Sequence, residues 1–76
     1  MFKHISADPS ILGGKPCITG TRLSVEFILE LFASGATRAE ILSAYPQLTA
    51  ESVGEALQYA ARSVKNEIIL EGEIAA

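Results

Sequence analysis

The seventeen residues from Asp8 to Ser24 constrain the fold most, because they hold three of the chain's six glycines and two of its three prolines. Glycine adopts positive φ without steric penalty, and proline fixes φ and removes a backbone donor. This composition predicts a tightly folded, β-like segment over residues 1–24 and not a loose linker. The apolar residues interleaved with the glycines and prolines are Ile11, Leu12, Ile18 and Leu23.

Residues 25–44 carry the signals of two short helices. Ser24 is suited to cap a helix over residues 25–34, and Gly35 stands where a helix commonly ends. Thr37 and Glu40 have the spacing of a capping box, in which each side chain accepts a hydrogen bond from an otherwise unpaired backbone N–H. The second helix should end at Tyr45-Pro46, since a residue that precedes proline disfavours the helical conformation.

A third helix is predicted from its cap at Thr49 to residue 64, because apolar residues recur there every three or four positions. With the second helix and the turn at 45–48 it has the dimensions of a helix-turn-helix, whose last helix enters the major groove of DNA. The same polar positions also suit the solvated face of a core helix, which spacing alone favours. The candidate DNA contacts are Lys15, Arg22 and Arg38 for phosphates, and Ser52, Glu55 and Gln58 on the last helix.

The distribution of charge bears on both interpretations. The chain has a net charge of −3, which is the wrong sign for binding nucleic acid by bulk electrostatics. Its first 25 residues are basic apart from Asp8, and its last third is acidic; Glu51 and Glu55 would oppose DNA phosphates. Arg22 has a second interpretation, a structural salt bridge to Asp8 that would hold the glycine-rich segment closed.

The apolar content points to a partner. Hydrophobic residues make up 49% of a chain of 76 residues, and a chain this short buries only about 60% of its unfolded surface. Some apolar side chains should therefore form a surface patch for a second copy or another protein, although core filling and a frayed chain end would also account for them. The candidates are Phe27 and Leu31 in the first helix and Ile68, Ile69, Leu70 and Ile74 in the tail, with Glu67, Glu71 and Glu73 as the tail's charges.

Several function classes find little support in these residues. The single cysteine, Cys17, suits a reducing compartment, and the single histidine, His4, has no acidic or cysteine neighbour in the sequence. Gly13-Gly14-Lys15 lacks the pattern of a phosphate loop, and no acid pair or Ser-His arrangement stands out. No apolar run approaches about 20 residues, and no signal peptide is recognisable. We therefore expect a cytoplasmic protein that is not an enzyme and has no cofactor, no metal and no membrane contact.

A series of short motifs is spaced along residues 5–61. They are Gly13-Gly14-Lys15-Pro16, Gly20-Thr21-Arg22 with Ser24-Val25, Gly35-Ala36-Thr37, Ile41-Leu42 with Tyr45-Pro46, Leu48-Thr49, and Ala56-Leu57-Gln58-Tyr59-Ala60. In order and spacing the chain resembles the bacterial family catalogued as domain of unknown function 433. The resemblance implies a mainly α fold: a short N-terminal β-hairpin element followed by a three-helix, homeodomain-like helix-turn-helix bundle, as one domain over residues 1–64 with a tail at 65–76.

The resemblance also implies a function. Members commonly sit beside a PIN-like ribonuclease toxin and look like the antitoxin half of a type II toxin–antitoxin pair; many such antitoxins repress their own operon as dimers or complexes. The expected partners are thus a cognate PIN-like toxin, a second copy of the chain and operator DNA. We expect Lys65–Ala76 to cover the toxin's basic RNA-binding surface. The alternatives are a DNA-binding transcriptional regulator or a homodimeric structural module without a toxin partner.

Overall fold

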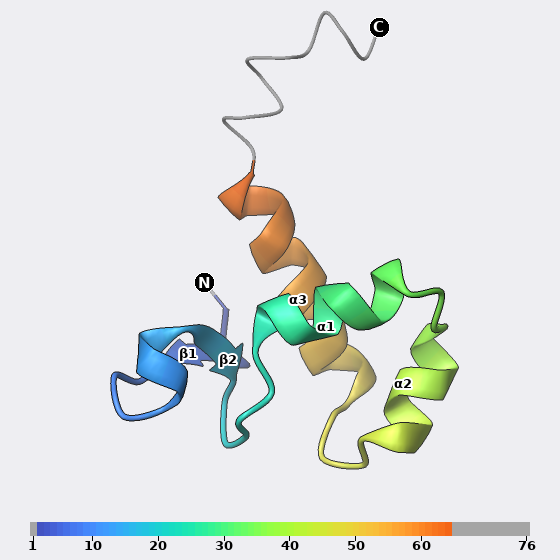
Figure 1. Cartoon of the computed structure of the whole chain (residues 1–76), viewed down its shortest axis with the longest axis horizontal. Helices are drawn as coiled ribbons and strands as arrows, with labels where there is room; N and C mark the ends of the chain where they lie inside the picture. The colour runs from blue at the N-terminus through green and yellow to red at the C-terminus, as the bar shows by residue number, and fades with distance from the viewer. Residues whose placement is uncertain (1, 65–76) are drawn as a thin grey trace, which may run out of the picture.

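The computed structural model describes residues 2–64, which form a short hairpin followed by three helices (Figure 1). Strand β1 (Ile5–Ala7) pairs antiparallel with β2 (Pro16–Ile18), so that Ile5 lies opposite Ile18 and Ala7 opposite Pro16. A single 3-10 turn, η1 (Leu12–Gly14), lies in the connection between the strands. The predicted hairpin is confirmed, and residues 9–15 make an arm at one side of the molecule.

The helices α1 (Val25–Ala33), α2 (Arg38–Ala44) and α3 (Ala50–Ser63) confirm the predicted helical segments. The hydroxyl of Ser24 accepts the N–H of Phe27 at 2.9 Å, which is the expected cap of α1. Thr37 and Glu40 form the predicted capping box at the start of α2. These caps satisfy backbone N–H groups that have no partner inside the helix, and they place each helix start at a defined residue.

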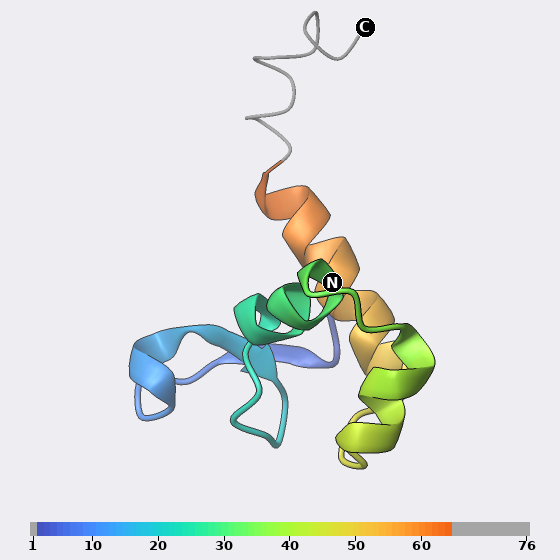
Figure 2. The same cartoon turned by 45° about the vertical axis from the view of Figure 1, so that its right-hand side comes forward.

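The core lies where α1 and α2 meet α3, and each strand covers one helix: β1 contacts α3, and β2 contacts α1. Figures 1 and 2 show the hairpin and α2 on opposite sides of the α1–α3 pair, while the last turns of α3 project beyond the other elements. The buried apolar cluster comprises Ile18, Val25, Ile28, Ile41, Leu48, Val53 and Ala56.

The second apolar stripe of α1, Phe27 and Leu31, packs partly within the domain. Phe27 is half-buried, and its ring meets the ring of Tyr45 edge-to-face at a centroid distance of 5.6 Å. Leu31 is also half-buried and packs against the core cluster. Tyr45, at the end of α2, thus covers part of the Phe27 ring, and the rest of that side chain stays accessible. Both side chains therefore pack partly within the domain, and their contact with a partner stays a prediction.

Fewer large apolar side chains are exposed than the composition suggests. Within residues 2–64, those that are exposed are Leu12, at 46%, and Val64, at 40%. Cys17 is a free, buried thiol. No helix in this part of the chain combines the length and apolarity needed to cross a bilayer. The predicted tail contacts, residues 65–76, lie outside the described residues.

Candidate functional site

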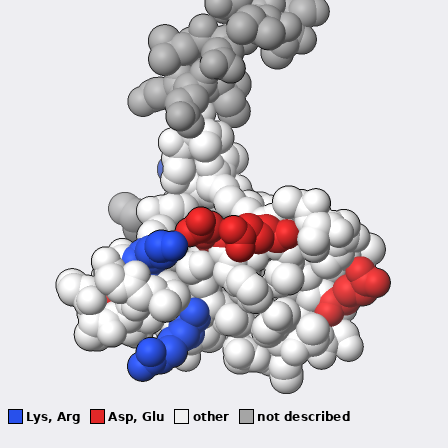
Figure 3. Space-filling view, viewed as in Figure 1, with Lys and Arg blue, Asp and Glu red and all other residues white. Residues whose placement is uncertain are grey.

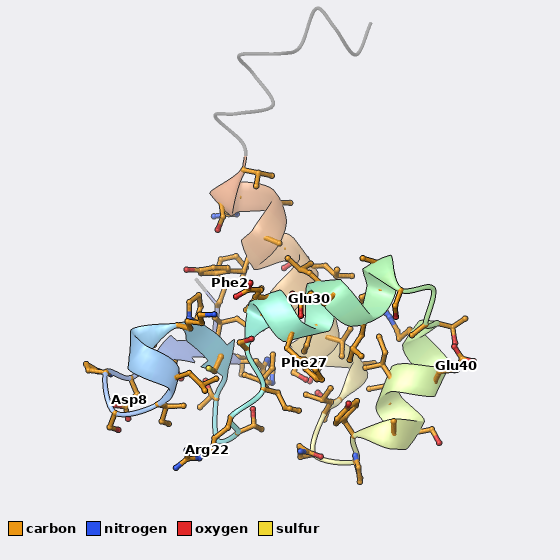
Figure 4. The ribbon with its side chains drawn as sticks, viewed as in Figure 1. Phe2, Asp8, Arg22, Phe27, Glu30 and Glu40 are labelled. Carbon is orange, nitrogen blue, oxygen red and sulfur yellow. The ribbon has the colours of Figure 1, made fainter. Side chains whose placement is uncertain are left out.

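An open hollow of about 650 Å³ lies between the hairpin arm and α1. The arm contributes one wall, the loop from β2 to α1 contributes the base, and the exposed side of α1 contributes the other wall. Figure 4 shows Arg22 at the tip of that loop, with Phe27 and Glu30 on α1. The residues that line it are Leu12, Lys15, Arg22, Leu23, Ser24, Glu26, Phe27 and Glu30.

Two of the four charged groups in the hollow pair with each other. The Lys15 Nζ donates a hydrogen bond to Oε1 of Glu26 at 2.8 Å. This hydrogen bond raises the pKa of Lys15 and lowers the pKa of Glu26 from their ordinary values. Both side chains are more than half exposed, at 57% and 59%, so the pair contributes little to stability but orients Lys15 along α1.

The other two charges, Arg22 and Glu30, are exposed and form no ion pair within residues 2–64. The expected salt bridge from Arg22 to Asp8 is absent from residues 2–64. The carboxylate of Asp8 instead accepts hydrogen bonds from Ser10, two residues along the chain. One carboxylate oxygen of Asp8 accepts the backbone N–H of Ser10 at 2.9 Å and its hydroxyl at 2.8 Å. These bonds lower the pKa of Asp8, the backbone one most. The arm is thus closed by a turn of its own and leaves Arg22 available.

A second, polar hollow of about 340 Å³ lies beside the first half of α3 and is lined by Lys3, His4, Glu51, Gly54, Glu55 and Gln58. Glu55 is tied to the start of the hairpin. One of its oxygens accepts the His4 backbone N–H at 2.8 Å, and the other lies 2.9 Å from Nδ1 of the ring. The hydrogen bond to the ring is the main cause of a lowered pKa for Glu55. The sequence showed no acidic neighbour for His4, because Glu55 comes near it only through folding.

The predicted DNA contacts on α3 differ in exposure and in hydrogen-bond partners. Ser52 is 2% exposed, and its hydroxyl bonds to the backbone of Thr49 in the capping box, so it is not offered to a groove. Glu55 is engaged with His4, which leaves its carboxylate fixed against the hairpin. Gln58 is exposed on α3. The spacing Thr49–Ser52 was the signal that could have identified the cap, since serine at that position completes the box.

The predicted phosphate contacts do not form one basic surface. Lys15 and Arg22 line the hollow beside α1, whereas Arg38 is the first residue of α2, on the opposite side of α1 (Figure 1). Figure 3 shows one basic patch bordering a row of acidic side chains, and a second basic patch that lies apart from that row. This arrangement is amphoteric, which suits contact with another protein better than contact with a polyanion.

An apolar groove of about 240 Å³ runs between the start of α1 and the end of α3. Its walls include Leu29 of α1 and Tyr59 and Ala60 of α3, and it reaches Val64, where the described residues end. The predicted tail contacts begin just beyond this point. No group of three or more His, Cys, Asp or Glu side chains within residues 2–64 is placed to hold a metal ion.

The family model and a solved structure both point to one family. Residues 5–60 match the family model described as a protein of unknown function (DUF433). An uncharacterised protein, y4eO, from Sinorhizobium fredii is 38% identical over 56 residues, which are 74% of this chain and 25% of that protein. This chain therefore spans about a quarter of that relative's length. The crystal structure of a DUF433 member from Anabaena variabilis superposes with a TM-score of 0.75 at 33% identity, over 96% of this chain and 69% of the other.

Proposed function

This chain belongs to the DUF433 family, and from that premise we propose that it is the antitoxin of a type II toxin–antitoxin pair, neutralising a PIN-like ribonuclease by direct binding. The family assignment identifies the fold, and the proposal concerns what its surfaces do. A protein that works by docking needs an accessible segment of apolar and charged side chains on a stable base.

The observation that carries this proposal is the way the chain leaves the domain. The last buried residue of the described part is Ala56, and residues 61–64 at the end of α3 are all exposed. Figure 2 shows this end of α3 projecting beyond the other elements. The next twelve residues in the sequence contain four large aliphatic side chains and three glutamates. A partner can reach the start of this segment without unfolding the bundle.

The chemistry of the segment complements a ribonuclease. An enzyme that binds RNA needs a basic surface for the phosphates. Glutamates match such a surface in charge, and neighbouring aliphatic side chains supply the buried anchors that give most of the affinity. A segment that has both is suited to cover the RNA-binding surface of the nuclease and exclude its substrate.

The test is co-expression of the full-length chain with the product of the adjacent gene. We expect the wild-type chain to restore growth and to co-purify with that product. Serine at Ile68, Ile69 and Leu70 together should abolish both effects and leave the helical circular dichroism unchanged. The matched control keeps the apolar character, with Ile68→Val, Ile69→Val and Leu70→Ile, and should neutralise normally. A wild-type chain that neither restores growth nor co-purifies would refute the antitoxin function, and full neutralisation by the serine variant would refute the role of the tail.

A second candidate function, repression of its own operon, is favoured by the order of α2, a short connection and α3, which is typical of a helix-turn-helix. The exposed Glu51 on α3 opposes the phosphates, so we propose that repression requires the complex with the toxin. A gel shift on the DNA upstream of the gene, with and without the partner, tests this. A shift only in the presence of the partner is expected, and no shift in either sample would leave only the protein-binding role.

A further inference from the structure

We propose that the hollow beside α1 is a self-complementary dimer interface. In this dimer Leu12 of each copy enters the hollow of the other, and Arg22 of each copy pairs with Glu30 of the other. The proposal rests on the described residues of the arm, the β2–α1 loop and α1. It does not depend on the proposed antitoxin function.

The backbone of the arm is the first observation. Leu12, Gly13 and Gly14 have φ values of 51°, 66° and 89°, so three successive residues adopt left-handed conformations. Glycine does this freely, whereas a leucine in this region is strained. Leu12 is also 46% exposed, more than any other large apolar side chain in residues 2–64. Strain and apolar exposure at one residue are both unfavourable in a monomer, and they indicate a side chain held out for a contact.

The charges are the second observation. Arg22 and Glu30 line the same hollow, and neither forms an ion pair within the described part of the chain, whereas Lys15 and Glu26 neutralise each other. A two-fold axis brings residue i of one copy to residue j of the other, and residue j to residue i. One unpaired cation and one unpaired carboxylate on the same face therefore give two equivalent ion pairs across such an axis.

The surroundings of these charges complete the interface. Leu23 and Phe27 line the hollow together with the charged groups, and Figure 4 shows Phe27 between Glu30 and Arg22. The hollow thus combines apolar and charged lining residues. Protein interfaces commonly have this arrangement. A different protein would have to supply an apolar side chain, a cation and a carboxylate at matching positions, and a second copy of this chain supplies all three.

The test is sedimentation equilibrium of full-length variants. The wild-type chain should dimerise, and Arg22→Glu and Glu30→Arg should each weaken dimerisation at least about tenfold, because each variant places like charges opposite each other. An equimolar mixture of the two variants should restore the dimer. In that heterodimer one copy carries two acids at positions 22 and 30 and the other two cations, so both ion pairs form again. A contact within one chain cannot produce this rescue.

The controls separate the interface from folding. Arg38→Glu makes the same charge change at the start of α2, on the other side of α1, and should dimerise as the wild type does. Leu12→Asn, which tolerates positive φ, should weaken the dimer and keep the helical circular dichroism. A monomeric wild-type chain, or Arg22→Glu and Leu12→Asn variants that dimerise normally, would overturn the proposal. A mixture that stays monomeric would also refute the Arg22–Glu30 pairing.

Discussion

Glu55 of α3 holds His4 at two atoms: one carboxylate oxygen accepts the His4 backbone N–H at 2.8 Å, and the other lies 2.9 Å from the ring Nδ1. The two residues are 51 positions apart, so this contact fastens the start of the hairpin to the bundle. The side chains are 27% and 21% exposed, which partly shields the pair from solvent. A residue that the sequence suggested for reading DNA is thus part of the connection between β1 and α3.

The lowered pKa of Glu55 predicts a pH dependence of stability. Because the folded-state pKa lies below the ordinary value of 4.5, the ionised carboxylate stabilises the fold at neutral pH. This contribution is lost as the pH falls from 4.5 through the lowered folded-state value. Thermal melts over that range should show a smaller loss of Tm in Glu55→Gln than in the wild type. Equal losses in the two proteins would contradict the prediction.

The capping box of α2 predicts a difference between two small substitutions at one position. Thr37→Ala removes the acceptor for the Glu40 N–H and should lower the free energy of unfolding by about 1 kcal/mol. Thr37→Ser retains the hydroxyl and should change the free energy of unfolding by only a few tenths of that amount. Urea unfolding followed by circular dichroism measures both, and an alanine variant as stable as the serine variant would show that the cap is not used.

The burial of Ser52 predicts that its substitution affects folding. Ser52→Ala removes the acceptor for the Thr49 N–H and a donor to the Thr49 carbonyl, so it should destabilise the protein by about 1 kcal/mol or more. Gln58→Ala, at an exposed position of the same helix, should leave stability nearly unchanged. Chemical denaturation compares the two, and equal stabilities would contradict the structural role of Ser52.

The core predicts a graded response at Ile28, which has 0% exposure. Ile28→Val should reduce the free energy of unfolding by about 0.5–1.5 kcal/mol, and Ile28→Ala by about 2–5 kcal/mol, because the alanine leaves a cavity among α1, α2 and α3. Denaturant melts test the ratio of the two losses. Similar losses would indicate that the site collapses around the smaller side chain.

The left-handed turn of the arm predicts opposite effects at neighbouring positions. Leu12→Gly should raise the free energy of unfolding of the monomer by about 1 kcal/mol, since it removes the strain at φ 51°. Gly13→Ala should lower it by a similar amount, because φ is 66° there and no atom lies near enough for the new methyl group to contact. Melts at concentrations too low for association isolate this backbone effect. Destabilisation by Leu12→Gly would refute the strain.

The parts of the fold that could be predicted are those held by interactions between residues close together in the sequence. Ser24, Thr37 and Thr49 act on backbone groups no more than three residues away, so their spacing in the sequence was sufficient to predict where each helix begins. The glycine-rich segment was likewise recognisable as a tightly folded, β-like segment, because positive φ is a property of single residues. Its hairpin form was implied by the family resemblance.

The amino-acid sequence alone thus determined the three helices, their caps and the hairpin that precedes them. Only the tertiary structure decided which side chains remain available: it turned Ser52 inward, joined Glu55 to His4, packed one side of Phe27 against Tyr45 and left Arg22 without Asp8. The physical reason is that the apolar stripe of a helix is visible in the helix's own sequence. The groups that contact its other side chains, in contrast, come from segments distant along the chain.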